Sequence, residues 1–269
     1  MLGVCSWSLQ PESPEDLAEK VRAAGLSAVQ LALDPVGEGE WALDRTVRVL
    51  AAAGIAIRSG MMRTKGEDYT TLETIRRTGG VRPDEHWEAN RASAERIAAI
   101  AADLKLTLVS FHAGFLPPKP GDALRKRLVE RLQLIADIFA RRGVRVAFET
   151  GQETADTLLG VLTEIARPSV GVNFDPANMI LYDHGDPIEA LRKLAPHVMQ
   201  IHIKDARRTT TPGEWGEETP VGEGEVDWPA FFEVVRTPRL DCDLMLERES
   251  GSQRLAEIRT AVDRIRTFG

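Results

Sequence analysis

The sequence predicts one α/β domain, a (β/α)8 barrel of the TIM-barrel type that spans residues 1–269. The chain has 269 residues, close to the roughly 250 residues that are typical of one such barrel. Apolar runs of strand length also alternate with longer helical segments along the whole chain. Several of these runs end in a polar side chain, as expected where parallel strands converge on the mouth of a barrel.

The clearest of these runs is residues 199–205, MQIHIKD. Side chains alternate between the two faces of a strand, so the apolar residues of this run share one face. Gln200, His202 and Lys204 share the other face. A buried polar group needs a partner, so we expect the polar face to point into a barrel, toward a site at its mouth.

Three further runs repeat this pattern, at residues 144–149, 170–175 and 243–249. In each run the apolar residues alternate with a face that carries a carboxylate near its C-terminal end. These carboxylates meet the histidine of residues 199–205 only if the strands are parallel neighbours around a closed ring. The residues selected in this way are Glu149, Asp175, His202 and Glu247, with Glu249 on the same face as Glu247.

Start and stop signals define the remaining elements. Ser13 and Pro14, followed by two acidic residues, are typical of a helix N-terminus, and this helix ends near Gly25. Eight strands thus alternate with eight helices. The predicted strands are residues 2–6, 27–33, 55–59, 106–111, 144–149, 170–174, 198–203 and 243–248. The later helices are residues 41–53, 84–103, 122–142, 153–166, 187–194, 228–235 and 252–267.

Two segments are too long for plain connections between a strand and a helix. Residues 60–87 contain a predicted short helix at 70–78, and we interpret this segment as an insertion over the barrel mouth that acts as a lid. Residues 205–227 form a second long loop, in which the glycine-rich residues 222–224 indicate a turn rather than a phosphate-binding loop.

Composition excludes several classes of protein. A hydrophobic fraction of 43% and a charged fraction of 28% are typical of globular domains. The net charge of −7 disfavours nucleic acid as a partner, since binding to phosphate backbones relies on a basic surface. No apolar stretch approaches the ~20 residues of a membrane span, and no secretory leader is recognisable. Cys5 and Cys242 form no CxxC motif, so we expect small buried thiols and a cytoplasmic location.

The four strand-end residues form a candidate metal site. Three carboxylates and one imidazole suit Mn²⁺, Mg²⁺ or Co²⁺ better than a thiolate-rich structural zinc site. One such ion would polarise a substrate carbonyl and stabilise an enediolate, while neighbouring glutamates act as acid and base. We therefore expect one divalent ion, with Mn²⁺ as the first choice and Mg²⁺, Co²⁺ or Zn²⁺ as alternatives.

Further residues are candidates for substrate binding. His112 follows the strand at 106–111, and Lys204 could polarise a substrate carbonyl or pair with Asp175 or Asp205. Arg207 could grip a substrate phosphate, although loop arginines are commonly plain surface charges. Glu249 either binds substrate or only lines the rim of the barrel.

Eight short stretches resemble the sugar phosphate isomerase/epimerase proteins of the xylose-isomerase-like TIM-barrel superfamily. The similarity extends over nearly the whole chain and indicates the superfamily without naming a substrate. The stretches are CSWSL at 5–9, VQLALDP at 29–35, FHAG at 111–114, FET at 148–150, NFDPANM at 173–179, IHIKDA at 201–206, VGEGEVDW at 221–228 and LERE at 246–249.

This resemblance implies roles for individual residues. In the ketose 3-epimerase branch, the residues equivalent to Glu149, Asp175, His202 and Glu247 bind one divalent metal. The two glutamates of that branch also exchange a proton on opposite faces of a sugar carbon. One position departs from the pattern, because Asn178 replaces a histidine of the epimerases. An asparagine here is expected to donate to a substrate hydroxyl rather than to bind metal.

The sequence thus predicts a metal-dependent isomerase or epimerase of a sugar, sugar phosphate or related ketone. The partner is a small carbohydrate, and a homo-oligomer is compatible with the sequence. A second candidate is a lyase or dehydratase that acts on a keto-inositol or 3-keto-glycoside through the same enediolate. An abasic-site endonuclease is a remote third, because that activity needs a histidine-rich zinc cluster and this chain has five histidines.

Overall fold

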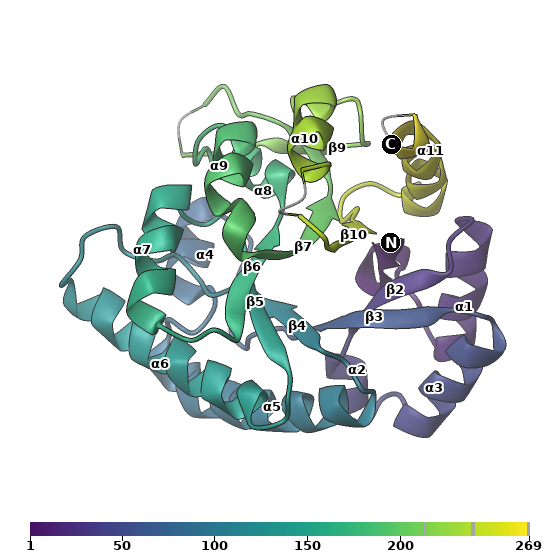
Figure 1. Ribbon diagram of the computed structural model, residues 1–269, viewed down its shortest axis with the longest axis horizontal. Coiled ribbons are helices and arrows are strands. Elements are labelled where there is room, and N and C mark those ends of the chain that lie inside the picture. Colours follow the sequence, from purple (N-terminus) through teal and green to yellow (C-terminus); the bar gives the residue numbers. More distant parts are fainter. Residues whose placement is uncertain (212, 238–239, 268–269) are drawn as a thin grey trace.

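Eight parallel strands close into a barrel in the computed structural model, which describes residues 1–211, 213–237 and 240–267. The predicted TIM barrel is confirmed (Figure 1). Its strands are β1 Leu2–Cys5, β2 Ala28–Ala32, β3 Ala56–Met61, β4 Leu108–Phe111, β5 Arg145–Glu149, β6 Val170–Phe174, β7 Val198–Ile203 and β10 Asp243–Leu246. Around the ring they follow the order β1, β10, β7, β6, β5, β4, β3, β2.

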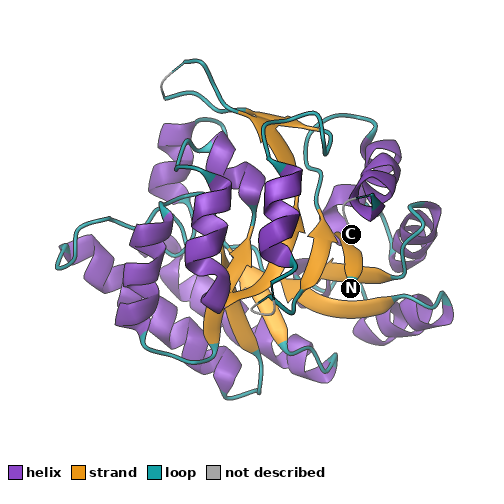
Figure 2. Ribbon diagram, turned by 45° about the horizontal axis from the view of Figure 1, so that its top comes forward, coloured by secondary structure: helices purple, strands orange, loops and turns teal. Residues whose placement is uncertain are grey.

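Helices surround this ring of strands (Figure 2). None in the described part of the chain is long and apolar enough to cross a membrane. The longer helices are α1 Pro14–Ala23, α3 Leu43–Ala52, α5 Asp84–Asp103, α6 Ala123–Ala140, α7 Ala155–Ile165, α9 Pro187–Leu194, α10 Trp228–Val235 and α11 Arg254–Arg266. The shorter ones are α2 Asp34–Gly37, α4 Leu72–Thr78, α8 Pro176–Leu181 and two 3₁₀ turns, Ser6–Leu9 and Ala195–His197.

The apolar face of each barrel strand packs outward under the helices. Phe148 of β5 and Phe174 of β6 are almost fully buried, as the alternation predicts. Phe148 contacts Phe111 of β4 edge to face at 5.4 Å, and Phe174 lies 6.4 Å from Phe231 of α10. Burial of one such side chain stabilises the fold by about 1.5–3 kcal/mol, which fixes the strand faces and leaves the polar residues inside.

The barrel interior below the mouth is polar and internally hydrogen-bonded. Ser59 Oγ donates to Gln200 Oε1 at 2.5 Å, and Gln200 Nε2 donates to Asn173 Oδ1 at 3.2 Å. On the other side, Gln30 Nε2 donates to Ser110 Oγ at 2.7 Å. Because these buried groups have partners, the interior can carry polar residues at little cost and can hold the strand ends above it rigidly.

The eight predicted helices are all present, and short helices add to them. Two of these short helices, α2 and α8, start at Asp-Pro pairs that fit a helix N-terminus. At four and six residues they are too short to show a helical period, so the sequence pattern did not reveal them. The helix predicted at 41–53 begins at Leu43.

The two long segments contain more structure than a loop. The extra helix of residues 60–87 is confirmed as α4, which Thr71 caps by accepting from the backbone N–H of Thr74. Residues 205–227 contain the antiparallel strands β8 Asp205–Arg207 and β9 Glu217–Thr219, which are too short to show alternation. Pro212 of this segment and the last two residues of the predicted domain lie outside the described residues.

Candidate metal centre

Strand register explains why four distant residues meet at the mouth of the barrel. Glu149 and His202 lie on β5 and β7, whereas Asp175 and Glu247 directly follow β6 and β10. These four strands are consecutive around the ring. Glu149 pairs with Asn173 in the ladder, and Asn173 pairs with Gln200. The next inward positions past Asn173 and Gln200 are therefore those of Asp175 and His202, one step nearer the mouth.

The ligand-type atoms of these four residues all lie within 4.8 Å of one another. His202 Nδ1 lies 3.5 Å from Glu149 Oε1, 3.4 Å from Glu247 Oε2 and 3.9 Å from Asp175 Oδ2. All four side chains are at most 4% exposed. The structure therefore brings together the three carboxylates and the imidazole that were predicted to hold a metal.

Two buried atoms at the centre have no hydrogen-bond partner, namely His202 Nδ1 and Asp175 Oδ2. The other imidazole nitrogen, Nε2, lies 2.7 Å from Gln30 Oε1. Because the amide nitrogen of Gln30 is used on Ser110 and on the carbonyl of Gly60, its oxygen faces Nε2 of the histidine, and Asn173 Nδ2 lies 3.0 Å from the same nitrogen. Burial opposes protonation of His202, but the charges of Glu247 and Glu149 raise its pKa well above the ordinary value, so Nδ1 carries a proton in the metal-free protein. A divalent cation in the place of this proton would fit the three carboxylates and the imidazole.

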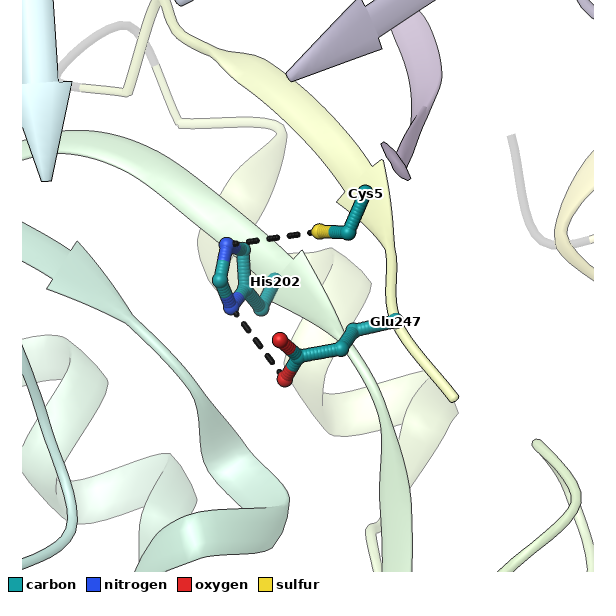
Figure 3. Close-up of side chains that lie close together, drawn as sticks. All are labelled: Cys5, His202 and Glu247. Carbon is teal, nitrogen blue, oxygen red and sulfur yellow. Dashed lines mark hydrogen bonds and ion pairs between the residues drawn. The ribbon is translucent and has the colours of Figure 1, made fainter. Parts of the chain in front are cut away.

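Cys5 lies beside the imidazole but on its other side (Figure 3). Its Sγ is 3.6 Å from His202 Nε2, whereas Glu247 approaches Nδ1. Burial raises the pKa of the Cys5 thiol to about 12, so the group stays protonated and is a poor metal ligand. Cys5 is thus a small buried thiol that packs against the histidine, close to the predicted role.

The carboxylates of the centre have unequal electrostatic environments. Burial opposes ionisation of Glu247, but the charges of Lys204 and His202 outweigh it and hold its pKa well below the ordinary value. Burial likewise opposes ionisation of Glu149, whose pKa is nevertheless lowered by His112 and His202. Burial raises the pKa of Asp175 well above its ordinary value, although Lys204 opposes this rise. The centre therefore lacks enough positive charge for three ionised carboxylates.

Lys204 connects the centre to the rim of the barrel. Its Nζ donates to Glu247 Oε2 at 3.0 Å and to Glu249 Oε2 at 2.6 Å. It lies 3.9 Å from Asp175 Oδ2, so the predicted approach to Asp175 is present at the limit of an ion pair. The alternative pairing with Asp205 is wrong, because Asp205 accepts hydrogen bonds from the 222–228 loop instead.

Asn178 and His112 both approach Glu149. Asn178 Nδ2 donates to Glu149 Oε1 at 2.9 Å, and its Oδ1 accepts from Lys204 Nζ at 3.3 Å. His112 Nε2 lies 3.8 Å from Glu149 Oε1, while its Nδ1 is buried without a partner. Asn178 therefore connects Glu149 to Glu247 through Lys204. The sequence did not predict these hydrogen bonds of Asn178.

A cleft of two adjoining parts, about 500 and 460 Å³, borders the centre through Trp7, His112, Asn178 and Lys204, which contact the four residues of the centre. Both parts are lined by Tyr69, His112 and Glu249, and the second also by Asn178 and Lys204. We call these two parts together the mouth cleft. Tyr69 belongs to the 60–87 segment, so the predicted lid lies at the mouth.

Arg207 is the one predicted substrate-binding residue that does not line the mouth cleft. It is exposed on β8, and its Nη2 donates to the carbonyl of Glu223 at 2.8 Å. Its neighbour Arg208 pairs with Asp183. Neither arginine is therefore placed to hold a group bound at the centre.

Three residues that support the centre are not among those predicted. Trp7 Nε1 donates to Glu247 Oε1 at 2.8 Å, Asn173 Nδ2 to Glu149 Oε2 at 3.3 Å, and Gln30 orients the imidazole. Gln30 and Asn173 lie on inward faces of β2 and β6, so strand alternation could have selected them. Trp7 lies on a 3₁₀ turn, where alternation gives no signal.

Comparison with known proteins places the chain among related barrels. A structure of a xylose isomerase domain protein from Planctomyces limnophilus shares 32% identity with a TM-score of 0.87, covering 93% of this chain and 91% of that one. A 3-keto-D-glucoside 4-epimerase from Escherichia coli shares the fold at 17% identity, with a TM-score of 0.75 and coverage of 99% and 98%.

Two curated relatives match shorter segments. Protein YihM of Escherichia coli is 28% identical over 149 residues, which are 54% of this chain and 44% of that protein. A 3-dehydroshikimate dehydratase of Bacillus anthracis is 30% identical over 86 residues, 30% of each chain. The chain thus matches less than half the length of either relative.

The family profile described as Xylose isomerase-like TIM barrel matches residues 18–268, which include all four residues of the centre. Its members with known reactions among these relatives are enzymes, an epimerase and a dehydratase. Together with the closed parallel barrel, this match shows that the chain belongs to the xylose isomerase-like TIM barrel family.

Proposed function

We propose that the chain is a divalent-metal-dependent isomerase or epimerase that moves a proton next to the carbonyl of a sugar ketone. The observation that carries this proposal is the pair of unpartnered buried atoms, His202 Nδ1 and Asp175 Oδ2, between Glu149 and Glu247. Such a donor set suits one divalent ion, with Mn²⁺ preferred and Mg²⁺, Co²⁺ or Zn²⁺ as alternatives. When bound, the ion supplies a Lewis acid for the substrate carbonyl.

Glu149 and Glu247 are the proposed acid and base. They approach His202 Nδ1 at 3.5 and 3.4 Å from strands that β6 and β7 separate in the ring. Each is held by a different donor, since Asn178 donates to Glu149 and Trp7 to Glu247. One carboxylate would take the proton from the substrate carbon, and the other would return one from the opposite side.

The charges of the mouth cleft favour a substrate without a phosphate. Its larger part is lined by four carboxylates besides Glu249 and by a single arginine, Arg63. Lys204 is already matched by Glu247 and Glu249. The negative charges of these carboxylates repel a phosphate group, so a neutral sugar fits this cleft better. We assign His112, Asn178, Lys204 and Glu249 to its hydroxyl and carbonyl groups.

A lyase or dehydratase is the second candidate, and the dehydratase from Bacillus anthracis favours it. Proton removal at the same carbon can expel a leaving group on the neighbouring carbon instead of returning the proton. Lys204 and Glu249 lie on the rim, where such a group would depart. The two reactions differ in mass balance, because an epimerase conserves mass and a lyase releases water or another leaving group.

The test is a screen of ketoses, keto-inositols and keto-glycosides with Mn²⁺ in D₂O. NMR should show deuterium entering next to a carbonyl, and mass spectrometry should show whether a leaving group is lost. Conserved mass supports the isomerase or epimerase, whereas release of water or an aglycone supports the lyase. Full activity of a chelated sample with no metal by elemental analysis would falsify the metal assignment.

A further inference from the structure

A separate pocket of about 360 Å³ lies beside the mouth cleft, where β5 leads into α7. It shares no lining residue with either part of that cleft. Phe115, which lines the pocket, contacts Tyr182 of the cleft edge to face at 5.5 Å. This aromatic contact forms part of the wall between the two, so the pocket is a site of its own.

One wall of this pocket carries hydrogen-bond acceptors that have no donor. Glu153 is 6% exposed and makes no hydrogen bond or ion pair with any described residue, and its carboxylate oxygens keep a slight contact with solvent at the pocket. The neighbouring Gln152 Oε1 is buried and also has no partner, because this side chain uses only its Nε2, on Tyr182. A buried acceptor without a donor destabilises a fold, by about 1–3 kcal/mol. A ligand that brings donors would remove this cost.

Another part of the lining carries cationic groups. Arg76 and Arg82 both line the pocket, and Arg82 Nη1 donates to the carbonyl of Arg76 at 2.8 Å. The guanidinium of Arg76 lies over the ring of Phe115 at 5.4 Å, and its nearest carboxylate is Glu73 at 4.0 Å. Neither arginine forms an ion pair with Glu153. The arginines are therefore available to an anion.

The rest of the lining is mixed, because Thr154, Thr157 and His184 lie beside a group of apolar residues. Leu116, Pro117 and Leu124 line the pocket together with Phe115. Such a lining suits a short hydrocarbon segment, with one polar group at each end. A ligand with only an anionic group would leave the acceptors of Glu153 and Gln152 without a donor. A ligand with only an amine would leave the arginines without an anion.

We propose that this pocket binds a small zwitterion, whose ammonium group donates to Glu153 and Gln152 and whose carboxylate accepts from Arg76 and Arg82. The ligand class is an amino acid or an amino-acid-like metabolite with a short apolar segment. Burial raises the pKa of Glu153 to about 8, and a bound ammonium group favours the ionised carboxylate that it pairs with. Ligand binding therefore also neutralises an unfavourable buried group.

The test uses a series of probes that differ in the spacing of their charges. Glycine, β-alanine, 4-aminobutyrate and 5-aminopentanoate are each titrated into the full chain by calorimetry, with and without Mn²⁺. Butyrate and butylamine serve as probes with one charge only. We expect at least one zwitterion to bind at least tenfold more tightly than either of the singly charged probes, whether or not Mn²⁺ is present.

Variants locate the binding. Glu153→Gln and Arg82→Gln should each weaken the best zwitterion at least tenfold, whereas Glu95→Gln, an exposed carboxylate of α5, should leave it unchanged. Circular dichroism confirms that each variant folds. The proposal is overturned if no zwitterion binds more tightly than butyrate and butylamine, or if Glu153→Gln binds as the parent does. These readouts do not depend on turnover, so they stand even if the proposed reaction is wrong.

Discussion

Two buried aspartates, Asp175 and Asp205, show how the same side chain serves different purposes in this barrel. Both are fully buried, and each follows a barrel strand, β6 or β7. Asp175 Oδ1 accepts one hydrogen bond, from the backbone N–H of Asn178, and Oδ2 accepts none. Asp205 accepts five, from four backbone N–H groups and from Trp228 Nε1.

The difference separates the candidate ligand site from a structural site. Asp205 holds the 222–228 loop in place, because its oxygens satisfy donors that the turn would otherwise leave buried and unpaired. Asp175 Oδ2 has no hydrogen-bond partner and lies among the other carboxylates and the imidazole of the centre. A buried carboxylate is thus explained by its hydrogen-bond partners rather than by its burial, and the following predictions test this distinction.

The largest effect on activity is expected for Glu149→Gln, a change at the candidate metal centre to which Asp175 belongs. Glutamine can still accept from Asn178 but cannot take a proton, so turnover should fall by about 10³-fold. Thermal unfolding should change by only a few degrees, because the shape of the side chain is retained. The rate of deuterium uptake by the substrate measures the first effect, and circular dichroism measures the second. If the variant retains more than a tenth of the parent rate, Glu149 is not the acid or base of the reaction.

The second prediction compares the two aspartates directly. Asp205→Asn turns an amide nitrogen toward backbone donors and should destabilise the fold by about 3 kcal/mol. Such a loss corresponds to roughly 6–12 °C in the unfolding temperature of a chain of this size. Asp175→Asn, measured without metal, should leave stability unchanged or raise it. Equal losses in the two variants would show that the distinction is wrong.

Metal binding gives the third prediction. Saturating Mn²⁺ should raise the unfolding temperature, because a ligand that binds the folded state stabilises it. His202→Gln should weaken Mn²⁺ binding about 100-fold, which is about 2.7 kcal/mol. Gln30→Leu removes the acceptor that orients the imidazole and should weaken binding about tenfold. Calorimetry on the chelated protein measures all three affinities, with Glu95→Gln as a control that should match the parent.

The fourth prediction concerns Glu153, a third buried carboxylate, and its effect appears only as the pH rises. Its pKa is raised to about 8 by burial, so the folded state binds a proton that the unfolded state has released above about pH 4.5. The stability that this proton contributes is fully present below that pH and is lost as the pH rises through about 8. Glu153→Gln should therefore lie close to the parent at pH 5 and exceed it by about 4–5 kcal/mol at pH 9, because the rise of the pKa from about 4.5 to about 8 is worth about 1.4 kcal/mol per pKa unit.

Urea unfolding of parent and variant at pH 5, 7 and 9 checks this sign. A difference that stays constant with pH would mean that Glu153 is not protonated in the folded protein. The same measurement with a bound zwitterion should abolish the pH dependence, because an ammonium group would match the ionised carboxylate.

Much of the fold follows from local patterns in the sequence. Strand alternation placed Glu149, Asp175, His202 and Glu247 on inward faces, since the period of two residues fixes which side chains share a face. Capping signals also located long helices such as α1, where Ser13 accepts from the backbone N–H of Asp16. The sequence did not predict the short helix α8 or the strands β8 and β9, because elements of three to six residues show too little periodicity.

The sequence by itself determined the closed barrel, the four donor residues and the polar character of the interior, because side-chain alternation and chain length are local properties. Tertiary structure alone decided that Lys204 pairs with Glu247 and Glu249, that Asn178 bridges to Glu149, and that Gln30 contacts the imidazole of His202. These contacts join residues that are up to 172 positions apart. Their distances depend on strand register and loop packing, which no local pattern records.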